Sequence, residues 1–191
     1  FTRLSEGMTP QGLVKVMNHY LSTMSGPIRS HRGIIDKYIG DAIMAYWGPP
    51  FTEHGEQASL ACLAAIEMAD RGAALRTELP ELLGVRAVPS DCDVRIGIAT
   101  GEVLVGSIGS EFMMSYTVMG DAVNLASRLE GANKETGTSI LLGPLTATRV
   151  AALPRTARVR RRIRAVVRAG DAADVSAAER RQRDRPRRQC V

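Results

Sequence analysis

The chain lacks the features that mark membrane-spanning and secreted proteins, and its composition is typical of a soluble globular protein. It has no apolar run of roughly 18 residues, the length that a membrane-spanning helix needs, and apolar residues make up 45% of its 191 residues. The N-terminal sequence does not join a positive charge to an apolar stretch, so it is not a signal peptide. It also has no initiator Met, so we expect the chain to be part of a longer protein.

Cysteine is scarce as well. Cys62, Cys92 and Cys190 are odd in number and show no C-x-x-C spacing, which argues against a disulfide framework or a zinc site. Cys62 lies in an apolar helical run and is most simply a small core residue. A reducing cytoplasm is the expected compartment.

Lysine is absent from residues 151–191, which hold 13 Arg and 4 acidic residues, whereas residues 1–150 hold 12 basic and 16 acidic residues. The net charge of +5 therefore comes from the tail alone. The tail could be a disordered basic arm that contacts nucleic acid or anionic lipid, a short helix, or a non-native reading frame of GC-rich DNA. We favour the last, because mixed Lys and Arg give way abruptly to Arg only. Without aromatic residues between the arginines, nucleic-acid binding is not expected.

The segment from Ile35 to Gly48 is the most informative part of the chain. Lys37 and Asp41 lie four residues apart around Gly40, between two short apolar runs. This pattern predicts a β-hairpin with Lys37 and Asp41 at its tip. Taken alone, the same pattern is also typical of a surface turn with two solvated charges.

Apolar spacing and turn residues predict the other elements. We expect three helices: one that begins at Thr9–Pro10 and bends or ends at Gly26–Pro27, one from about Glu56 to Thr77, and one from Ala122 to about Asn133. Besides the hairpin we expect strands at 94–99, 102–105, 113–119 and 137–142, and a loop at 79–89. With a strand before Phe1, the order is β-α-β-β-α-β. This α/β (α+β) class is ferredoxin-like, with a central, mostly antiparallel sheet and helices packed on it.

A second segment, Tyr116 to Gly131, carries complementary chemistry. Asn124 and Arg128 are an i, i+4 pair, so they project together from one face of the predicted helix. An amide and a guanidinium side by side suit a ligand that bears phosphate, because Arg offers a planar fork of donors. An ordinary polar helix face is the alternative when this segment is taken alone.

Together these segments resemble the catalytic domain of class III nucleotidyl cyclases, the adenylyl and guanylyl cyclases. Three motifs in order carry the resemblance: Asp36-Lys37-x-x-Gly40-Asp41-x-x-Met44-Ala45, Arg95-Ile96-Gly97-Ile98-x-x-Gly101-x-Val103-x-x-Gly106 and Tyr116-x-x-x-Gly120-x-x-Val123-Asn124-x-Ala126-Ser127-Arg128. The resemblance covers residues 1–153 and implies a catalytic domain there, with residues 154–191 as a separate Arg-rich tail. It also implies that Phe1-Thr2 ends a motif whose metal-binding aspartate lies four residues before Phe1.

The resemblance assigns a role to five positions. Asp41 matches one of two aspartates that bind two Mg²⁺ or Mn²⁺ ions, and the other aspartate lies outside the sequence. Lys37 and Thr117 match the pair that selects the purine, and their identities favour ATP over GTP. Asn124 matches the residue that positions the ribose, and Arg128 matches the arginine that stabilises charge on the transferring phosphoryl group.

The expected function is that of a bacterial-type adenylyl cyclase, which converts ATP to cyclic AMP and pyrophosphate. The family's sites lie between two protomers, so the resemblance implies a homodimer, and it implies a sensor or membrane domain before Phe1 that could anchor a cytoplasmic catalytic domain. Because one metal carboxylate is absent, we expect this fragment to turn over poorly. The alternatives are a guanylyl or dual-specificity cyclase, or a non-catalytic cyclase-like dimerisation or regulatory module.

Overall fold

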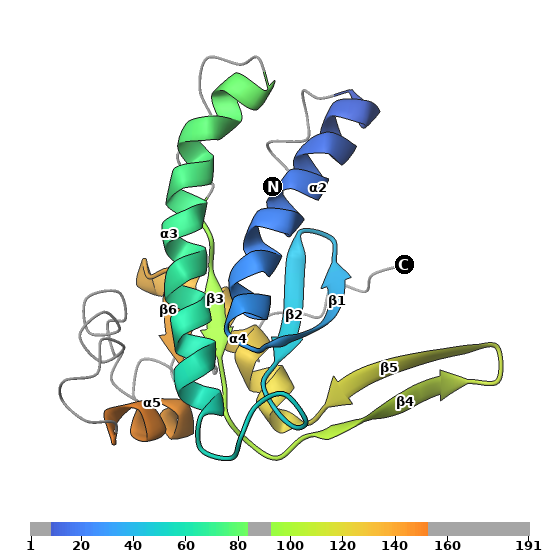
Figure 1. Ribbon diagram of the computed structural model, residues 1–191, viewed down its shortest axis with the longest axis vertical. Coiled ribbons are helices and arrows are strands. Elements are labelled where there is room, and N and C mark those ends of the chain that lie inside the picture. Colours follow the sequence, from blue (N-terminus) through green and yellow to red (C-terminus); the bar gives the residue numbers. More distant parts are fainter. Residues whose placement is uncertain (1–8, 84–92, 153–191) are drawn as a thin grey trace. The chain divides into compact units, whose positions relative to one another are not determined.

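The structure is a computed structural model that describes residues 9–83 and 93–152 (Figure 1). The chain forms two compact units, Phe1–Val94 with Val103–Met119, and Arg95–Glu102 with Gly120–Val191. The Arg-rich tail and the predicted boundary near residue 153 lie outside the described residues. None of the helices in these two ranges combines the length and the apolar content that a membrane span requires.

Two long helices of the first unit, α2 (Pro10–Ser30) and α3 (Gln57–Leu83), pack against each other (Figure 1). Thr9 caps α2 as predicted, because its side chain accepts a hydrogen bond from the Gly12 N–H at 3.2 Å. Gly26–Pro27 does not end this helix. Pro27 is buried in its last turn, where packing offsets the lost hydrogen bond, and the helix continues to Ser30. The predicted loop at 79–89 is also wrong over its first residues, because α3 runs on to Leu83.

The core of the first unit lies between these helices and the hairpin. Val16, Met24 and Leu75 are buried together, and four partly buried side chains pack against them: Tyr20, Ile43, Met68 and Val94. Cys62 is buried on α3, as predicted, and burial raises the pKa of its thiol to about 12. The thiol therefore stays protonated at neutral pH and behaves as a small core side chain.

The predicted hairpin is present, but its tip is shorter than expected. Strand β1 (Ile34–Ile39) pairs antiparallel with β2 (Ala42–Tyr46), and only Gly40 and Asp41 form the loop. Gly40 has a φ of 62°, which favours glycine at the first position of a two-residue hairpin loop. The prediction that Lys37 lies at the tip is wrong, because Lys37 lies within β1 and pairs with Met44.

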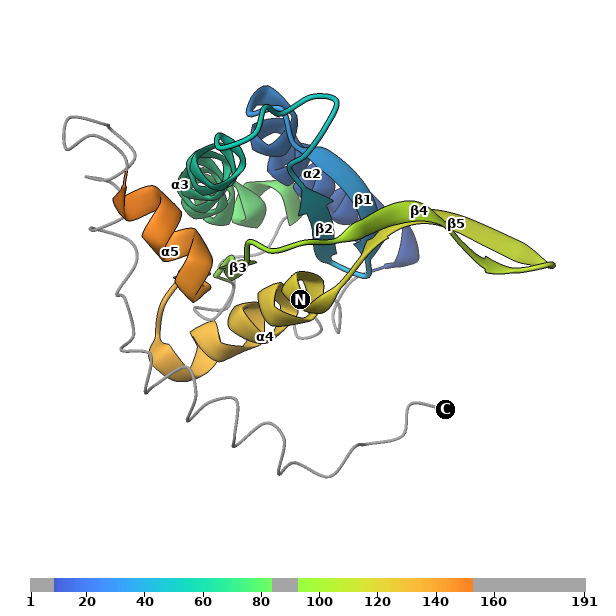
Figure 2. The same cartoon turned by 90° about the horizontal axis from the view of Figure 1, so that it is seen from below.

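A second hairpin in this unit joins β4 (Leu104–Ser110) to β5 (Met113–Met119), and Figure 2 shows it as a long two-stranded ribbon. The strand predicted at 102–105 is thus longer and begins later, whereas that at 113–119 is confirmed. Many of its large apolar side chains are exposed: Leu104, Val105, Phe112, Met113, Met114, Tyr116 and Met119. We call these seven residues the apolar hairpin surface.

In the second unit, β3 (Ile96–Ile98) pairs in parallel with β6 (Ile140–Leu142), and α4 (Asp121–Thr136) packs on both strands (Figure 1). Both strands are shorter than predicted, and α4 extends a turn further. A last helix, α5 (Pro144–Ala151), was not predicted, although Pro144 at its first turn is a common helix-start signal. Gly97 lets β3 approach α4 closely, because a Cβ there would meet the backbone of Ala126 and Glu130.

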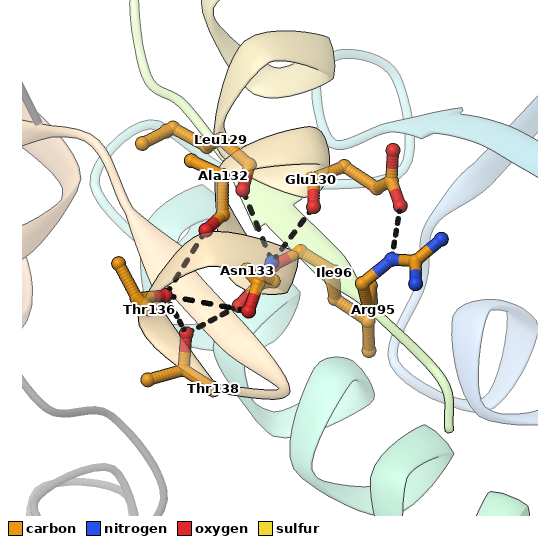
Figure 3. Close-up of polar contacts among 8 residues, drawn as sticks. All are labelled: Arg95, Ile96, Leu129, Glu130, Ala132, Asn133, Thr136 and Thr138. Atoms are coloured by element: carbon orange, nitrogen blue, oxygen red, sulfur yellow. Dashed lines mark hydrogen bonds and ion pairs between the residues drawn. The ribbon is translucent and has the colours of Figure 1, made fainter. Parts of the chain in front are cut away.

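Asn133 joins the end of α4 to the neighbouring strand. Its amide nitrogen donates to the carbonyl oxygen of Ile96 at 3.0 Å, and its side-chain oxygen accepts from the Thr138 hydroxyl at 2.7 Å (Figure 3). The side chain is 1% exposed, so these bonds satisfy polar atoms that have little access to water. They fix the end of α4 against β3.

The described strands form three two-stranded sheets, two antiparallel and one parallel. The mixed helix-and-strand class is therefore confirmed, and antiparallel pairs predominate as predicted. A single central sheet is not formed by strands in residues 9–83 and 93–152. The strand that the predicted order begins with falls before Phe1.

Candidate functional site

A buried carboxylate organises the hairpin end of the first unit. The side chain of Asp36 is 1% exposed, and it accepts hydrogen bonds from the Thr117 hydroxyl at 2.9 and 3.1 Å and from the Val118 N–H at 2.8 Å. These bonds link β1 to β5, which are 81 residues apart in sequence at Thr117. The carboxylate therefore joins the two segments that carry the predicted purine-selecting residues.

Lys37 lies beside the same carboxylate. Its ammonium is 3.4 Å from an Asp36 oxygen, and its side chain is 40% exposed. The ammonium thus contacts Asp36 on one side, and its remaining N–H donors are accessible to a ligand. The structure brings the predicted pair Lys37 and Thr117 together at Asp36.

Two tyrosines lie near this cluster. Burial raises the pKa of the Tyr46 hydroxyl, and the neighbouring Tyr116 and Asp36 add to the rise. Tyr46 is consequently neutral at physiological pH. It adds no negative charge beside Asp36.

Asp41 lies in the exposed loop of the β1–β2 hairpin. Among the residues that the structure describes, its side chain forms no hydrogen bond or ion pair, so its oxygens are available to a cation. The same residues contain no group of three or more His, Cys, Asp or Glu side chains that could hold a metal ion. Mg²⁺ is often bound by one or two carboxylates together with substrate phosphates, so a single exposed Asp fits part of such a site.

Asn124 and Arg128 belong to α4 of the second unit. Asn124 is exposed in the second turn of the helix. Arg128 is half-buried, and its Nε atom is buried without a hydrogen-bond partner among the described residues. A buried donor that lacks a partner costs free energy, so this guanidinium is suited to an acceptor that arrives with a ligand.

Comparison with protein families identifies the family of this chain. Residues 1–164 match the family model of the adenylate and guanylate cyclase catalytic domain. The chain belongs to this family. The resemblance drawn from the three motifs is thereby confirmed.

Individual cyclases support the same reading. Over 145 residues, or 74% of its length, the chain is 39% identical to adenylate cyclase 1 of Rhizobium meliloti (strain 1021). Over 142 residues, also 74% of its length, it is 37% identical to an adenylate cyclase of Anabaena cylindrica. The chain spans 20% and 27% of the lengths of these two relatives.

A solved structure confirms the cyclase fold. The crystal structure of the guanylyl cyclase Cya2 matches with a TM-score of 0.63 and 33% sequence identity. The match covers 78% of this chain and 72% of that one. This likeness, at that identity and over most of both chains, agrees with the family assignment.

The residue that sequence reasoning missed is Asp36. In the sequence Asp36 is one position of a motif, and a carboxylate next to a lysine is typical of a solvated surface charge. The available signal was the break in strand alternation at Asp36-Lys37. Its contact with Thr117 depends on pairing between distant segments, which no local pattern reports.

Proposed function

We propose that this chain is the catalytic domain of an adenylyl cyclase that converts ATP to 3′,5′-cyclic AMP and pyrophosphate in intracellular signalling. The observation that carries the proposal is the meeting of Lys37 and Thr117 at Asp36. Membership in the cyclase family and the adenylate cyclase relatives support it. The bound nucleotide is the chain's proposed partner.

Lys37 and Thr117 would recognise the purine. Adenine presents an acceptor at ring nitrogen N1 and a donor at its amino group. An ammonium supplies donors only, so Lys37 suits N1. The Thr117 hydroxyl oxygen suits the amino group, and its neighbour Asp36 holds it in place.

Asn124 and Arg128 would serve the reacting groups. The ribose 3′-oxygen forms a bond to the α-phosphorus, the bond from that phosphorus to the β-bridging oxygen breaks, the 3′-hydroxyl proton passes to solvent, and pyrophosphate leaves. Asn124 would orient the ribose. Arg128 would donate to the phosphoryl oxygens on which negative charge builds, and its unpartnered Nε supports this role.

Asp41 would contribute to holding divalent Mg²⁺ or Mn²⁺, with a second aspartate from sequence before Phe1. When bound, such ions offset the charge of the triphosphate and make the 3′-hydroxyl a better nucleophile. Asp41 supports the proposal because it is an exposed hard-oxygen donor without a competing partner among the described residues.

We further propose a homodimer with two equivalent sites, in which Asp41 comes from one protomer and the other four residues come from its partner. Lys37 and Asp41 of one hairpin would then serve different sites. The apolar hairpin surface supports dimerisation, because monomeric soluble proteins rarely expose so many large apolar side chains together. The greater length of the curated relatives leaves room for an upstream sensor or membrane domain.

The test is cyclic nucleotide formation from ATP and from GTP with Mn²⁺, in a protein extended to include the upstream aspartate. We expect cyclic AMP, and we expect ATP to be preferred. The double variant Lys37→Glu with Thr117→Cys should lose at least about tenfold in kcat/KM for ATP, because two hydrogen bonds to adenine are lost. Lys134→Glu, an exposed charge on α4, serves as the control and should leave the preference unchanged.

Two other functions give different results in this assay. A guanylyl cyclase, which the likeness to Cya2 favours, would form cyclic GMP in preference to cyclic AMP. A non-catalytic cyclase-like module would form neither product while still dimerising. Unchanged ATP preference in the double variant would refute the roles proposed for Lys37 and Thr117.

A further inference from the structure

Asp36 occupies an irregular position in the β1–β2 hairpin. Ile35 pairs with Ala45 and Lys37 pairs with Met44, so the register shifts at Asp36 and leaves it without a partner on β2. Neighbouring residues of a regular strand point to opposite faces, but a bulge turns a side chain away from that alternation. The bulge is consistent with Asp36 and Lys37 lying close enough to form an ion pair.

The surroundings of this carboxylate fix its role as an acceptor. Its recorded partners are the Thr117 hydroxyl, the Val118 N–H and the Lys37 ammonium. An N–H and an ammonium can only donate, and an ionised carboxylate can only accept. A buried carboxylate surrounded in this way is satisfied in its charged form.

The consequence falls on Thr117. A hydroxyl group has one proton, and at 2.9 and 3.1 Å from the two Asp36 oxygens that proton is committed to the carboxylate. The Thr117 oxygen then offers only lone pairs to a ligand. Without Asp36, the same hydroxyl could turn and donate instead.

We propose that Asp36 is a specificity-determining positioning residue, which sets the hydrogen-bond polarity of the base site. It makes Thr117 an acceptor beside Lys37, a donor. Adenine, with a donating amino group and an accepting N1, matches this pair, whereas guanine, with an accepting O6 and a donating N1–H, opposes it at both positions. The inference rests on the proposed adenylyl cyclase function and adds a residue that does not touch the base.

The first test needs no substitution. Inosine triphosphate has an accepting O6 and a donating N1–H in place of the two groups of ATP, and it lacks the 2-amino group of GTP. The unaltered extended protein should therefore use inosine triphosphate and GTP similarly, both at least about tenfold less efficiently than ATP in kcat/KM. Inosine triphosphate used as well as ATP would overturn the inference.

The second test is Asp36→Asn. The new amide can donate to Thr117, which frees the hydroxyl proton to point at the ligand, so the ratio of kcat/KM for ATP to that for GTP should fall about tenfold. The same substitution in a Thr117→Val background should change the ratio less than about twofold, because no hydroxyl remains to reorient. If Asp36 had only a structural role, its substitution would lower kcat/KM for ATP and for GTP by the same factor. An unchanged ratio of the two would therefore overturn the inference.

The outcomes separate the inference from the proposed function. Cyclic AMP formation with an unchanged ratio in Asp36→Asn leaves the adenylyl cyclase proposal standing and removes only the role of Asp36. Absence of cyclic AMP formation by the unaltered extended protein overturns the proposed function, and with it the inference. If Asp36→Asn fails to fold, the comparison of ATP with inosine triphosphate decides the matter.

Discussion

Arg128 carries a buried donor, Nε, that no described residue satisfies. Proteins rarely leave such a donor without an acceptor, so an arginine in this state at a family motif is more informative than an exposed one. Its guanidinium also differs from an ammonium in shape. A fork of donors can meet two phosphoryl oxygens at once, and a lysine cannot reproduce that geometry.

We therefore expect Arg128→Lys to lower kcat about a hundredfold with little change in KM, because the lost contacts form mainly in the transition state. Steady-state kinetics with ATP in the extended protein would measure this. Arg149→Lys, on the exposed side of α5, is the matched control and should keep full activity. A variant that changes KM and leaves kcat alone would show that Arg128 binds the ground state instead.

At the scale of elements, sequence patterns predicted most helices and strands, but their ends depended on packing. Pro27 reads locally as a helix end, yet it is buried within the last turn of α2. The charged pair Asp36-Lys37 interrupts the apolar alternation, so the sequence places Lys37 at a hairpin tip. In the structure the interruption is a bulge inside β1, and the strand continues past it. The five predicted site residues could be taken from motifs, but the role that we propose for Asp36 depends on its contact with β5.

Gly97 shows how one element constrains another. A Cβ at this position would meet the backbone of Ala126 and Glu130, and backbone atoms cannot rotate aside as a side chain can. We expect Gly97→Ala to lower the free energy of unfolding by about 3 kcal/mol, because α4 must move away from β3. Urea unfolding followed by circular dichroism would measure the change.

Gly106→Ala is the matched control for this prediction. Gly106 also lies in a strand, but a Cβ there would meet nothing within 4 Å. Its substitution should change the free energy of unfolding by less than about 0.5 kcal/mol. Equal stability of the two variants would show that β3 and α4 are not packed as closely as the structure indicates.

At the scale of the whole molecule, the apolar hairpin surface stands out, because burial within one chain does not account for its large exposed apolar side chains. Phe112 is 88% exposed and Met113 is 74% exposed, values unusual for large apolar side chains outside an interface. The β4–β5 hairpin also carries Thr117, whose hydroxyl contacts Asp36. Dimerisation through this hairpin would couple assembly to the base site, because the same strand serves both.

We therefore expect Phe112→Glu with Met113→Lys to shift the protein from dimer to monomer, since charged side chains resist burial in an apolar interface. Sedimentation equilibrium would report the mass, and cyclic AMP formation should fall with it. Val14→Lys, a similarly exposed apolar residue on α2, should leave both dimer and activity intact.

The proposed dimer also predicts how activity depends on concentration. Activity per protomer should fall when the unaltered extended protein is diluted below its dimer dissociation constant, because each proposed site takes residues from two copies. A monomeric protein whose specific activity is independent of concentration would contradict the shared-site proposal.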